Sequence, residues 1–259
     1  AGSDAASLTT KAELQGESYV VNGTKAFISG AGETDLLIVM ARTSDAGAKG
    51  ISCFAIPANS DGISFGKKED KLGWSNQPTR LIHFENVWVP AENLIGTEGQ
   101  GFSLAMAGLD GGRINIAACS VGTAKAALKH STAYVKERQQ FNRPISEFQS
   151  TQFKLADMLT ELTAARQMIR LAAFNLDTHH PDKSAYCAMA KRFATDIGFK
   201  VCDEALQLHG GYGYIKEFPI ERYFRDNRVH RILEGTNEVM RLIIAKQLLN
   251  DENMQLIQT

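Results

Sequence analysis

The chain has 259 residues, of which 44% are hydrophobic and 22% are charged, a balance that allows one large domain or two smaller ones with a sizeable core. The formal net charge of −1 gives no electrostatic reason to expect nucleic acid or an acidic membrane surface as a partner. No apolar run in the sequence approaches the roughly 18 residues that a membrane-spanning helix needs.

Residues 18–90 are predicted to form strands. The first run, SYVVNGTKAFISG, carries Asn22-Gly23 between apolar segments, which predicts a β-hairpin turn at this pair. Further β-rich runs follow at 36–43, 50–58, 62–66 and 79–90. Short strands separated by Gly, Asp and Asn indicate a compact barrel or sandwich, and we expect a mainly antiparallel β-barrel domain over residues 1–95.

After Pro90 the hydrophobic period becomes helical. Residues 96–102 form a glycine-rich linker, and a first long helix is predicted over residues 113–138. Three later segments carry apolar residues at helical spacing: Leu155, Leu159, Leu162, Ile169 and Leu176; Ala185, Met189, Phe193, Ile197, Val201 and Ala205; and Val239, Leu242, Ile243 and Leu249. Long amphipathic helices with short connections predict an antiparallel four-helix bundle over residues 96–259, so the expected fold class is α+β.

The cysteine and histidine residues give no metal-binding pattern. The four cysteines form no CxxC pair and lie in apolar contexts, so we expect buried thiols in a reducing compartment: Cys53, Cys119, Cys187 and Cys202. His179 and His180 lie in THHPD, which is predicted to be a polar turn between helices where histidines are solvated. The sequence therefore predicts no metal site.

The stretch HGGYGY (209–214) resembles half of a dinucleotide fingerprint. No strand precedes it, so the Rossmann interpretation lacks its structural context. A helix C-cap explains one glycine and is what the residues alone favour. Two adjacent glycines exceed what a cap needs, and they would also let a ligand approach the backbone closely.

Two basic stretches allow two interpretations each. In LDGGRINIAA, Asp110 is expected to cap the long helix and Arg113 to lie in its first turn, where a cation opposes the helix dipole. Such an arginine often binds a phosphate or a carboxylate, although an exposed side chain fits equally well. In KERQQFNRP, Arg138 and Arg143 flank Phe141 near a helix end. Helix capping explains both cations, and a phosphate clamp with an aromatic partner is the sharper alternative.

One acid stands out in RILEGTNEVMR. Glu234 lies just outside a helix for which Thr236 is the predicted N-cap and Glu238 a favourable first-turn acid. Burial beside Ile232 and Leu233 would raise the pKa of Glu234 towards the range that suits a general base. Without that burial, Glu234 is an ordinary solvated acid, which is the default from the residues alone.

The sequence resembles the acyl-CoA dehydrogenase family over essentially its whole length, with the motifs in family order. The stretches that carry the resemblance are AGSDAAS, NGTKAFISGAGE, LGWSNQPTR, GTEGQGF, GLDGGRINIAA, RQQF, QLHGGYGY and RVHRILEGTNEVMR. The family combines an N-terminal helical domain, a β-domain and a C-terminal four-helix domain. The sequence begins inside the family's EPGxGSD flavin loop, so we expect the N-terminal helical domain to be absent from this chain.

The resemblance implies an FAD-dependent α,β-dehydrogenation of an acyl-CoA thioester. A carboxylate removes the α-proton while the β-hydrogen leaves as hydride to N5 of the flavin, which requires a base positioned in a dry site. The position that matches the family's base is Glu234. Some relatives place the base just before the arginine of LDGGR, and this position is Gly112 in the present chain, which leaves Glu234.

Other roles are implied at positions that match family motifs. The implied cofactor contacts are Phe27, Ile28, Ser29, Phe141, Thr236, Asn237 and Glu238, together with residues that reach the FAD of a neighbouring subunit: Arg138, Phe148, Gln149, Gln207, Leu208, His209, Gly210 and Gly211. The implied acyl-CoA contacts are Ser3, Asp110, Gly111, Gly112, Arg113, Gly235 and Lys246. At the last position a lysine keeps the charge of an arginine but loses its bidentate geometry.

The resemblance also implies partners. We expect a homo-oligomer, either a dimer or a tetramer, with electron transfer flavoprotein as electron acceptor, in the mitochondrial matrix or a bacterial cytoplasm. Isobutyryl-CoA is the expected substrate. 2-Methylbutyryl-CoA and butyryl-CoA follow closely, because a methyl branch changes the free energy that discriminates between substrates by only about 1–3 kcal/mol. Two alternatives remain open: an acyl-CoA oxidase of the same fold, and a flavin-binding or assembly module without turnover.

Overall fold

The computed structural model describes residues 1–250 and residue 256. Contacts within the chain divide it into two compact units: unit 1 comprises residues 1–108, and unit 2 begins at residue 109. The predicted division between residues 95 and 96 lies earlier in the chain. The difference arises because the first two turns of the helix that follows this point belong to unit 1.

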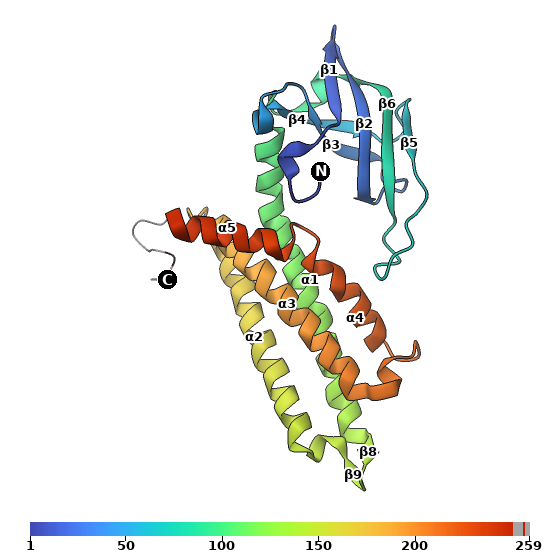
Figure 1. The fold of residues 1–259 in the computed structure, drawn as a ribbon, viewed down its shortest axis with the longest axis vertical. Helices are drawn as coiled ribbons and strands as arrows, with labels where there is room; N and C mark the ends of the chain where they lie inside the picture. Colours follow the sequence, from blue (N-terminus) through green and yellow to red (C-terminus); the bar gives the residue numbers. More distant parts are fainter. Residues whose placement is uncertain (251–255, 257–259) are drawn as a thin grey trace. The chain divides into compact units, whose positions relative to one another are not determined.

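Unit 1 is built on one seven-stranded sheet (Figure 1). The strands lie in the order β5-β6-β2-β1-β3-β4-β7, and all neighbours are antiparallel except β1 and β3, which are parallel. Their bounds are β1 (Lys11–Gln15), β2 (Ser18–Ser29), β3 (Leu36–Arg42), β4 (Ile51–Pro57), β5 (Ile63–Phe65), β6 (Thr79–Pro90) and β7 (Leu94–Ile95).

This sheet is open. The structure confirms most of the predicted strands but not the predicted barrel. Strands are confirmed in each of the four predicted runs after residue 30, and the core of unit 1 includes Val21, Phe54, Ile56 and Val87, all fully buried. The strand order nevertheless ends at β5 and β7, so the predicted closed barrel is wrong for the described strands. Closure depends on pairing between strands distant in sequence, which local alternation does not specify.

The Asn22-Gly23 pair lies inside β2, and the predicted hairpin turn at this point is wrong. The ladder between β2 and β6 has a bulge here, and Oδ1 of Asn22 accepts a hydrogen bond from the backbone N–H of Asn86 at 2.8 Å. Gly23 has a φ of +146°, and a Cβ on it would lie 2.8 Å from Cα of Thr10. The glycine therefore permits close backbone approach. The hairpin turn lies instead at Gly16, between β1 and β2.

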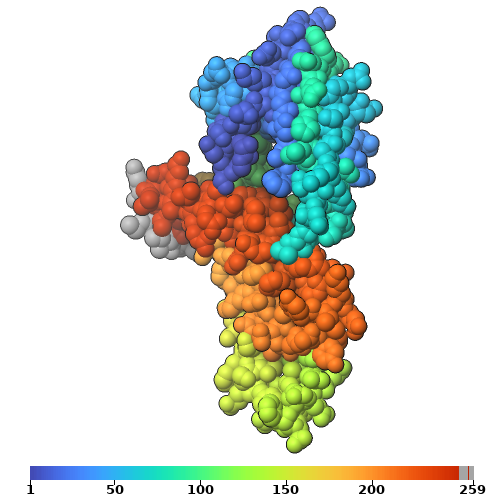
Figure 2. Space-filling view, turned by 45° about the vertical axis from the view of Figure 1, so that its right-hand side comes forward, coloured from blue at the N-terminus to red at the C-terminus, as the bar shows by residue number. Residues whose placement is uncertain are grey.

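Unit 2 is helical, which confirms the expectation for the second half of the chain. Its helices are α1 (Gly101–Glu137, which starts in unit 1), α2 (Gln149–Asp177), α3 (Lys183–His209), α4 (Ile220–Arg228) and α5 (Asn237–Asn250). Two short strands, β8 (Gln139–Gln140) and β9 (Arg143–Pro144), pair at the opposite end of unit 2 from α5 (Figure 1), and the colours of these two ends are also separate in the space-filling view (Figure 2). The sequence patterns did not predict α4, and the four-helix arrangement stays a prediction.

Small side chains allow the long helices to approach one another closely. Ala124 and Ala127 of α1 share a buried cluster with Met158 of α2 and Val201 and Ala205 of α3. The polar turn that contains the two adjacent histidines joins α2 to α3, as predicted. At three positions the helical spacing wrongly predicts a buried side chain: Leu159, Leu242 and Leu249 are 58%, 70% and 84% exposed.

The helix α1 begins at Gly101 rather than near Arg113. A Cβ at Gly101 would lie 2.8 Å from Cα of Ser52, so a tertiary contact fixes the start of the helix. Asp110 and Arg113 consequently lie inside α1, and their predicted roles as N-cap and first-turn cation are wrong. Glycines in this segment each cost about 1 kcal/mol of helix propensity relative to alanine, which explains why the local pattern indicated a break.

Three of the four cysteines are buried, as expected, whereas Cys119, on α1, is exposed, so the expectation is wrong for this residue. Within residues 1–250 and 256, no cluster of three or more His, Cys, Asp or Glu side chains is arranged to hold a metal ion. The helices described by the structure include none with the length and hydropathy required to cross a membrane.

His230 is expected to make unit 2 sensitive to acid. Its side chain is 2% exposed, its Nδ1 lies 3.1 Å from Oδ1 of Asn227, and burial lowers its pKa from 6.5 to about 4. The unfolded chain therefore binds more protons between these values, so stability is present above pH 6.5 and is lost as pH falls to 4. The loss should be about 3 kcal/mol, measured by urea unfolding across this range.

The variant His230→Gln should show a shallower pH dependence of unfolding than the parent protein. His179→Asn, a substitution of an exposed histidine that has a positive φ, is the matched control and should leave the slope unchanged. Equal slopes for the parent and His230→Gln would contradict the assignment.

Candidate functional site

Glu234 has a backbone conformation that is unusual for its side chain. It lies between η6 (Val229–Arg231) and α5, with a φ of +56°, and the following Gly235 has a φ of +86°. Left-handed backbone at a residue other than glycine costs about 1–3 kcal/mol and persists where surrounding contacts enforce it. Ile232 is 54% exposed, so it does not bury Glu234, which is itself partly buried.

Arg113 supports the backbone of Glu234. Its side chain is buried, and Nε donates a hydrogen bond to the carbonyl oxygen of Glu234 at 3.4 Å. Its Nη1 donates to Oδ1 of Asp110 at 2.7 Å, and Oδ2 of Asp110 accepts from the Ser184 hydroxyl at 2.5 Å. The anionic partner that the sequence suggested for Arg113 is therefore a carboxylate of its own helix, and the exposed alternative is wrong.

A second buried cation supports the next residue. Nζ of Lys191, on α3, donates a hydrogen bond to the carbonyl oxygen of Gly235 at 2.7 Å. Burial lowers the pKa of Lys191 from 10.5 to about 8. The carbonyl oxygens of two consecutive left-handed residues are thus both bound by basic side chains, one from α1 and one from α3.

Gly112 provides the space for the Glu234 carboxylate. A Cβ built on Gly112 would overlap Oε2 of Glu234 and lie 2.8 Å from its Cδ. The two positions at which the family resemblance places a base, 112 and 234, therefore direct their side chains into the same space within unit 2. Because the two side chains would overlap, only one of these positions can carry a bulky side chain.

The residues after Glu234 have different environments. Thr236 is the N-cap of α5, as predicted, because its Oγ1 accepts from the backbone N–H of Val239 at 3.3 Å. The Asn237 side chain is 3% exposed and bonds within unit 2 to Lys191, Thr195 and Asp196, so it does not offer a free amide to a cofactor. Glu238 is exposed, as is Lys246 later in α5.

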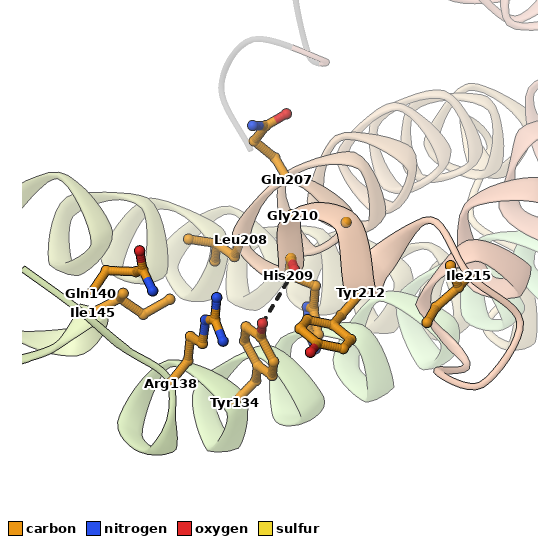
Figure 3. A pocket seen from close by; sticks show the side chains of 11 residues that line it. Tyr134, Arg138, Gln140, Ile145, Gln207, Leu208, His209, Gly210, Tyr212 and Ile215 are labelled. Carbon is orange, nitrogen blue, oxygen red and sulfur yellow. Dashed lines mark hydrogen bonds between the residues drawn. The ribbon is translucent and has the colours of Figure 1, made fainter.

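A pocket of about 530 Å³ in unit 2 brings together six of the predicted cofactor contacts (Figure 3). These six are Arg138, Gln207, Leu208, His209, Gly210 and Gly211. The helix α3 ends at His209, and Gly210, with a φ of +58°, is its C-cap, as the residues favoured. No atom lies within 4 Å of a Cβ built on either Gly210 or Gly211, so the backbone there is open to close approach.

Aromatic rings surround this pocket. The Tyr134 ring stacks on His209 at 4.3 Å between centroids, and its hydroxyl donates to the His209 carbonyl oxygen at 3.3 Å (Figure 3). The Arg138 guanidinium lies 5.7 Å from the Tyr212 ring. Sequence reasoning missed Tyr134, Gln140, Ile145, Tyr212 and Ile215. Tyr134 and Arg138 are four positions apart at the end of the helix that the sequence predicts over residues 113–138, and this spacing could have identified Tyr134.

Three further predicted contacts do not line this pocket. Phe141 and Phe148 form an edge-to-face pair at 6.1 Å, and the Arg143 guanidinium lies 4.1 Å from the Phe148 ring. Arg143 therefore stacks on an aromatic ring and does not join Arg138 at the pocket, so the two arginines are not brought together as the phosphate-clamp alternative required. Gln149 begins α2, outside the lining residues.

A second pocket, of about 590 Å³, lies within unit 1. Phe27 and Ile28 line it, next to a bulge that separates Lys25 from Ile28 in the ladder with β6, and Phe27 has a φ of +55° with 77% exposure. Ala1 and Gly2 also line the pocket, whereas Ser3 and Ser29 do not. A strained and exposed aromatic residue beside a bulge indicates a binding surface.

Family models support the grouping of these motifs. The acyl-CoA dehydrogenase middle-domain model matches residues 1–87, and the acyl-CoA dehydrogenase C-terminal-domain model matches residues 99–249. The chain belongs to the acyl-CoA dehydrogenase family. Members of this family are FAD-dependent oxidoreductases that act on CH–CH donors. The predicted domain division, between residues 95 and 96, lies in the interval between the two matches.

Several relatives are similar over nearly the whole chain. Mitochondrial isobutyryl-CoA dehydrogenases from Dictyostelium discoideum and Bos taurus are 57% and 53% identical, over 97% and 96% of this chain. The structure of butyryl-CoA dehydrogenase from Megasphaera elsdenii has a TM-score of 0.94 at 43% identity and covers 96% of this chain. The matches cover 61%, 60% and 66% of those three proteins, respectively.

Proposed function

We propose that this chain is the flavin-binding and catalytic part of an acyl-CoA dehydrogenase for short branched-chain substrates, with isobutyryl-CoA as the preferred one. The observation that carries the proposal is the left-handed Glu234, whose carboxylate occupies the space beside Gly112 while buried cations bind the two adjacent carbonyl groups. The relatives named isobutyryl-CoA dehydrogenase support the branched substrate.

The proposed role of Glu234 is to accept the α-proton of the acyl thioester at its carboxylate. A general base must be held within hydrogen-bond reach of that proton, and fixing the backbone of residues 234 and 235 serves this purpose. When bound, FAD supplies the acceptor for the hydride that leaves the β-carbon. Asp110 and Arg113 are buried and paired, so we assign them to supporting Glu234 and the thioester site from within unit 2.

The residues present fit a flavin nucleotide. In unit 2, Arg138 offers a cation, the open backbone at Gly210 and Gly211 permits close approach, and Tyr134 and Tyr212 offer ring faces. Cations and exposed backbone suit phosphate groups, and aromatic faces suit the flat rings of a nucleotide. In unit 1, Phe27 and Ile28 are assigned to the isoalloxazine, and Thr236 and Glu238 retain their proposed cofactor contacts.

Because the pocket residues of unit 2 are assigned to the FAD of a neighbouring subunit, we propose a homo-oligomer, either a dimer or a tetramer. Exposed apolar side chains on α2 and α5 support self-association: Phe153, Leu159, Phe174, Leu242 and Leu249. The proposed acceptor of the electrons is electron transfer flavoprotein. The proposed location is the mitochondrial matrix or a bacterial cytoplasm, in keeping with the mitochondrial names of the two relatives.

Substituting Arg138 tests the assignment of the unit 2 pocket. Arg138→Gln removes the cation and should raise the Kd for FAD by about 10-fold, since a charge-assisted hydrogen bond contributes roughly twice as much as a neutral one. Flavin fluorescence during titration of the apoprotein measures the change. Arg166→Gln, at an exposed position on α2, is the matched control and should bind FAD as the parent does.

The substrate assignment is tested with the full-length protein under anaerobic conditions. Isobutyryl-CoA, 2-methylbutyryl-CoA and butyryl-CoA are mixed separately with the FAD-loaded protein, and the rate of loss of the yellow flavin absorbance is recorded. Isobutyryl-CoA should give the largest kcat/KM. No bleaching with any of these thioesters would contradict the proposal. Faster reoxidation by air than by electron transfer flavoprotein would assign the protein as an oxidase.

A further inference from the structure

Lys191 is a buried charge in unit 2 that the proposed mechanism uses only through its hydrogen bond to the Gly235 carbonyl oxygen. It lies in the N-terminal half of α3 with an exposure of 0%. Burying an ammonium group is unfavourable unless it is hydrogen-bonded, and this cost is visible in the pKa of Lys191, which burial lowers to about 8. An apolar side chain would pack at this position without that cost, so the contacts of Nζ should explain why the chain has a lysine.

Both partners of Nζ belong to the segment that follows Glu234. Nζ donates to the carbonyl oxygen of Gly235 at 2.7 Å and to Oδ1 of Asn237 at 2.9 Å. These two acceptors lie on either side of Thr236, which caps α5. Lys191 therefore joins the N-terminal half of α3 to the point where the Glu234 turn becomes a helix.

Asn237 extends this attachment along α3. Its Nδ2 donates to Oγ1 of Thr195 at 3.0 Å and to Oδ1 of Asp196 at 3.0 Å. Asp196 in turn accepts from Nε of Arg231, on the other side of Glu234, at 2.8 Å. Hydrogen bonds to α3 thus hold the chain both before and after Glu234.

The opposite side of the turn is held by Arg113, through the Glu234 carbonyl oxygen. Rotation of Glu234 out of the left-handed region would move both carbonyl groups away from their donors. In the left-handed conformation that these contacts hold, Gly112 leaves room for the Glu234 carboxylate. The network therefore couples a backbone conformation to the place of one carboxylate.

We propose that Lys191 is a positioning residue for Glu234, acting through the Gly235 carbonyl and the Asn237 side chain to keep the carboxylate beside Gly112. The inference rests on the proposed function, because it assigns Lys191 to the base of that reaction. A purely structural lysine, which only joins α3 to α5, would affect folding without affecting the proton transfer. The two roles therefore predict different effects on kcat.

The test compares Lys191→Gln with Lys200→Gln in the full-length, FAD-loaded protein. Lys200 lies on the same helix and forms a partly exposed ion pair with Glu161 at 2.7 Å, so it is a matched control. Three quantities are measured: the amide hydrogen exchange of residues 234–237, kcat and KM for isobutyryl-CoA, and the Tm.

For Lys191→Gln we expect exchange at residues 234 and 235 to be faster by about 10-fold, because a hydrogen bond from a charged group is lost. We expect kcat to fall by about 10- to 100-fold while KM stays within about threefold of the value for the parent protein, since a small misplacement of a reacting group has effects of this size on rate. Lys200→Gln should leave exchange and kcat within about twofold of the parent, as expected for a surface ion pair.

Unchanged exchange at the Glu234 turn would overturn the proposal, and so would faster exchange with an unchanged kcat. If Lys191→Gln does not fold, Thr195→Val is the second variant, because it removes the hydroxyl that bonds Asn237 while keeping its shape. It should accelerate the same amides by about threefold, and no acceleration would overturn the proposal. Exchange does not depend on turnover, so failure of Glu234 as the base is distinguishable from failure of Lys191 as its support.

Discussion

Glu234→Gln should fold and retain yellow FAD but lose dehydrogenase turnover by at least about 10³-fold, within the range that a positioned general base contributes. Glutamine has the same length as glutamate and keeps the hydrogen bonds of the backbone carbonyl groups to Arg113 and Lys191. Its amide does not accept the α-proton. The loss should therefore appear in kcat, measured with isobutyryl-CoA and electron transfer flavoprotein, while the Tm stays close to that of the parent.

Glu217→Gln is the matched control for this prediction. It makes the same chemical change at an exposed position before α4, so turnover should stay within about twofold of the parent, as for most surface substitutions. Two results would contradict the assignment of the base. One is turnover in Glu234→Gln close to that of the parent, and the other is loss of FAD together with turnover, which would indicate a structural role for the carboxylate.

Gly112→Ala should have opposite effects on stability and activity. Alanine is favoured over glycine inside a helix by about 1 kcal/mol, so the Tm should be unchanged or slightly higher. The added methyl group, however, would overlap the carboxylate of Glu234, which is the flexible end of a side chain and would move away. Displacement of the base should lower kcat by about 10- to 100-fold with little change in KM.

Gly122→Ala separates the two effects. This glycine lies farther along α1, and no atom lies within 4 Å of a Cβ built on it, so the substitution should give the same gain in helix propensity without a loss of turnover. Thermal unfolding and steady-state kinetics on both variants measure the comparison. Equal kcat values for Gly112→Ala and Gly122→Ala would show that the carboxylate is not confined beside Gly112.

Local patterns predicted the elements of this protein better than their boundaries. The strands from residue 36 to residue 90 and the long helices α2 and α3 agree with the alternation and the helical repeat that the sequence shows. The start of α1 and the Asn22-Gly23 turn were wrong, because a contact with Ser52 and a close approach to Thr10 determine the backbone there. Neither contact can be predicted from the residues that are its neighbours in sequence.

The sequence by itself determined the family, the position of the candidate base and most of the residues around the pocket in unit 2. These features reside in short motifs whose letters are readable without coordinates, such as LEGTNE and LHGGYG. Tertiary structure decided that the sheet is open, that Tyr134 and Tyr212 join the pocket, and that Glu234 is held in the left-handed region.

The physical reason lies in the sequence distance of the contacts. Arg113 reaches the Glu234 carbonyl across 121 positions, and Lys191 reaches Gly235 across 44. Local periodicity reports which face of a segment is apolar, but it contains no information on which distant donor will meet a given carbonyl group. The sequence could therefore identify the acid at position 234, whereas only the packing of α1 and α3 around it decided where its carboxylate lies.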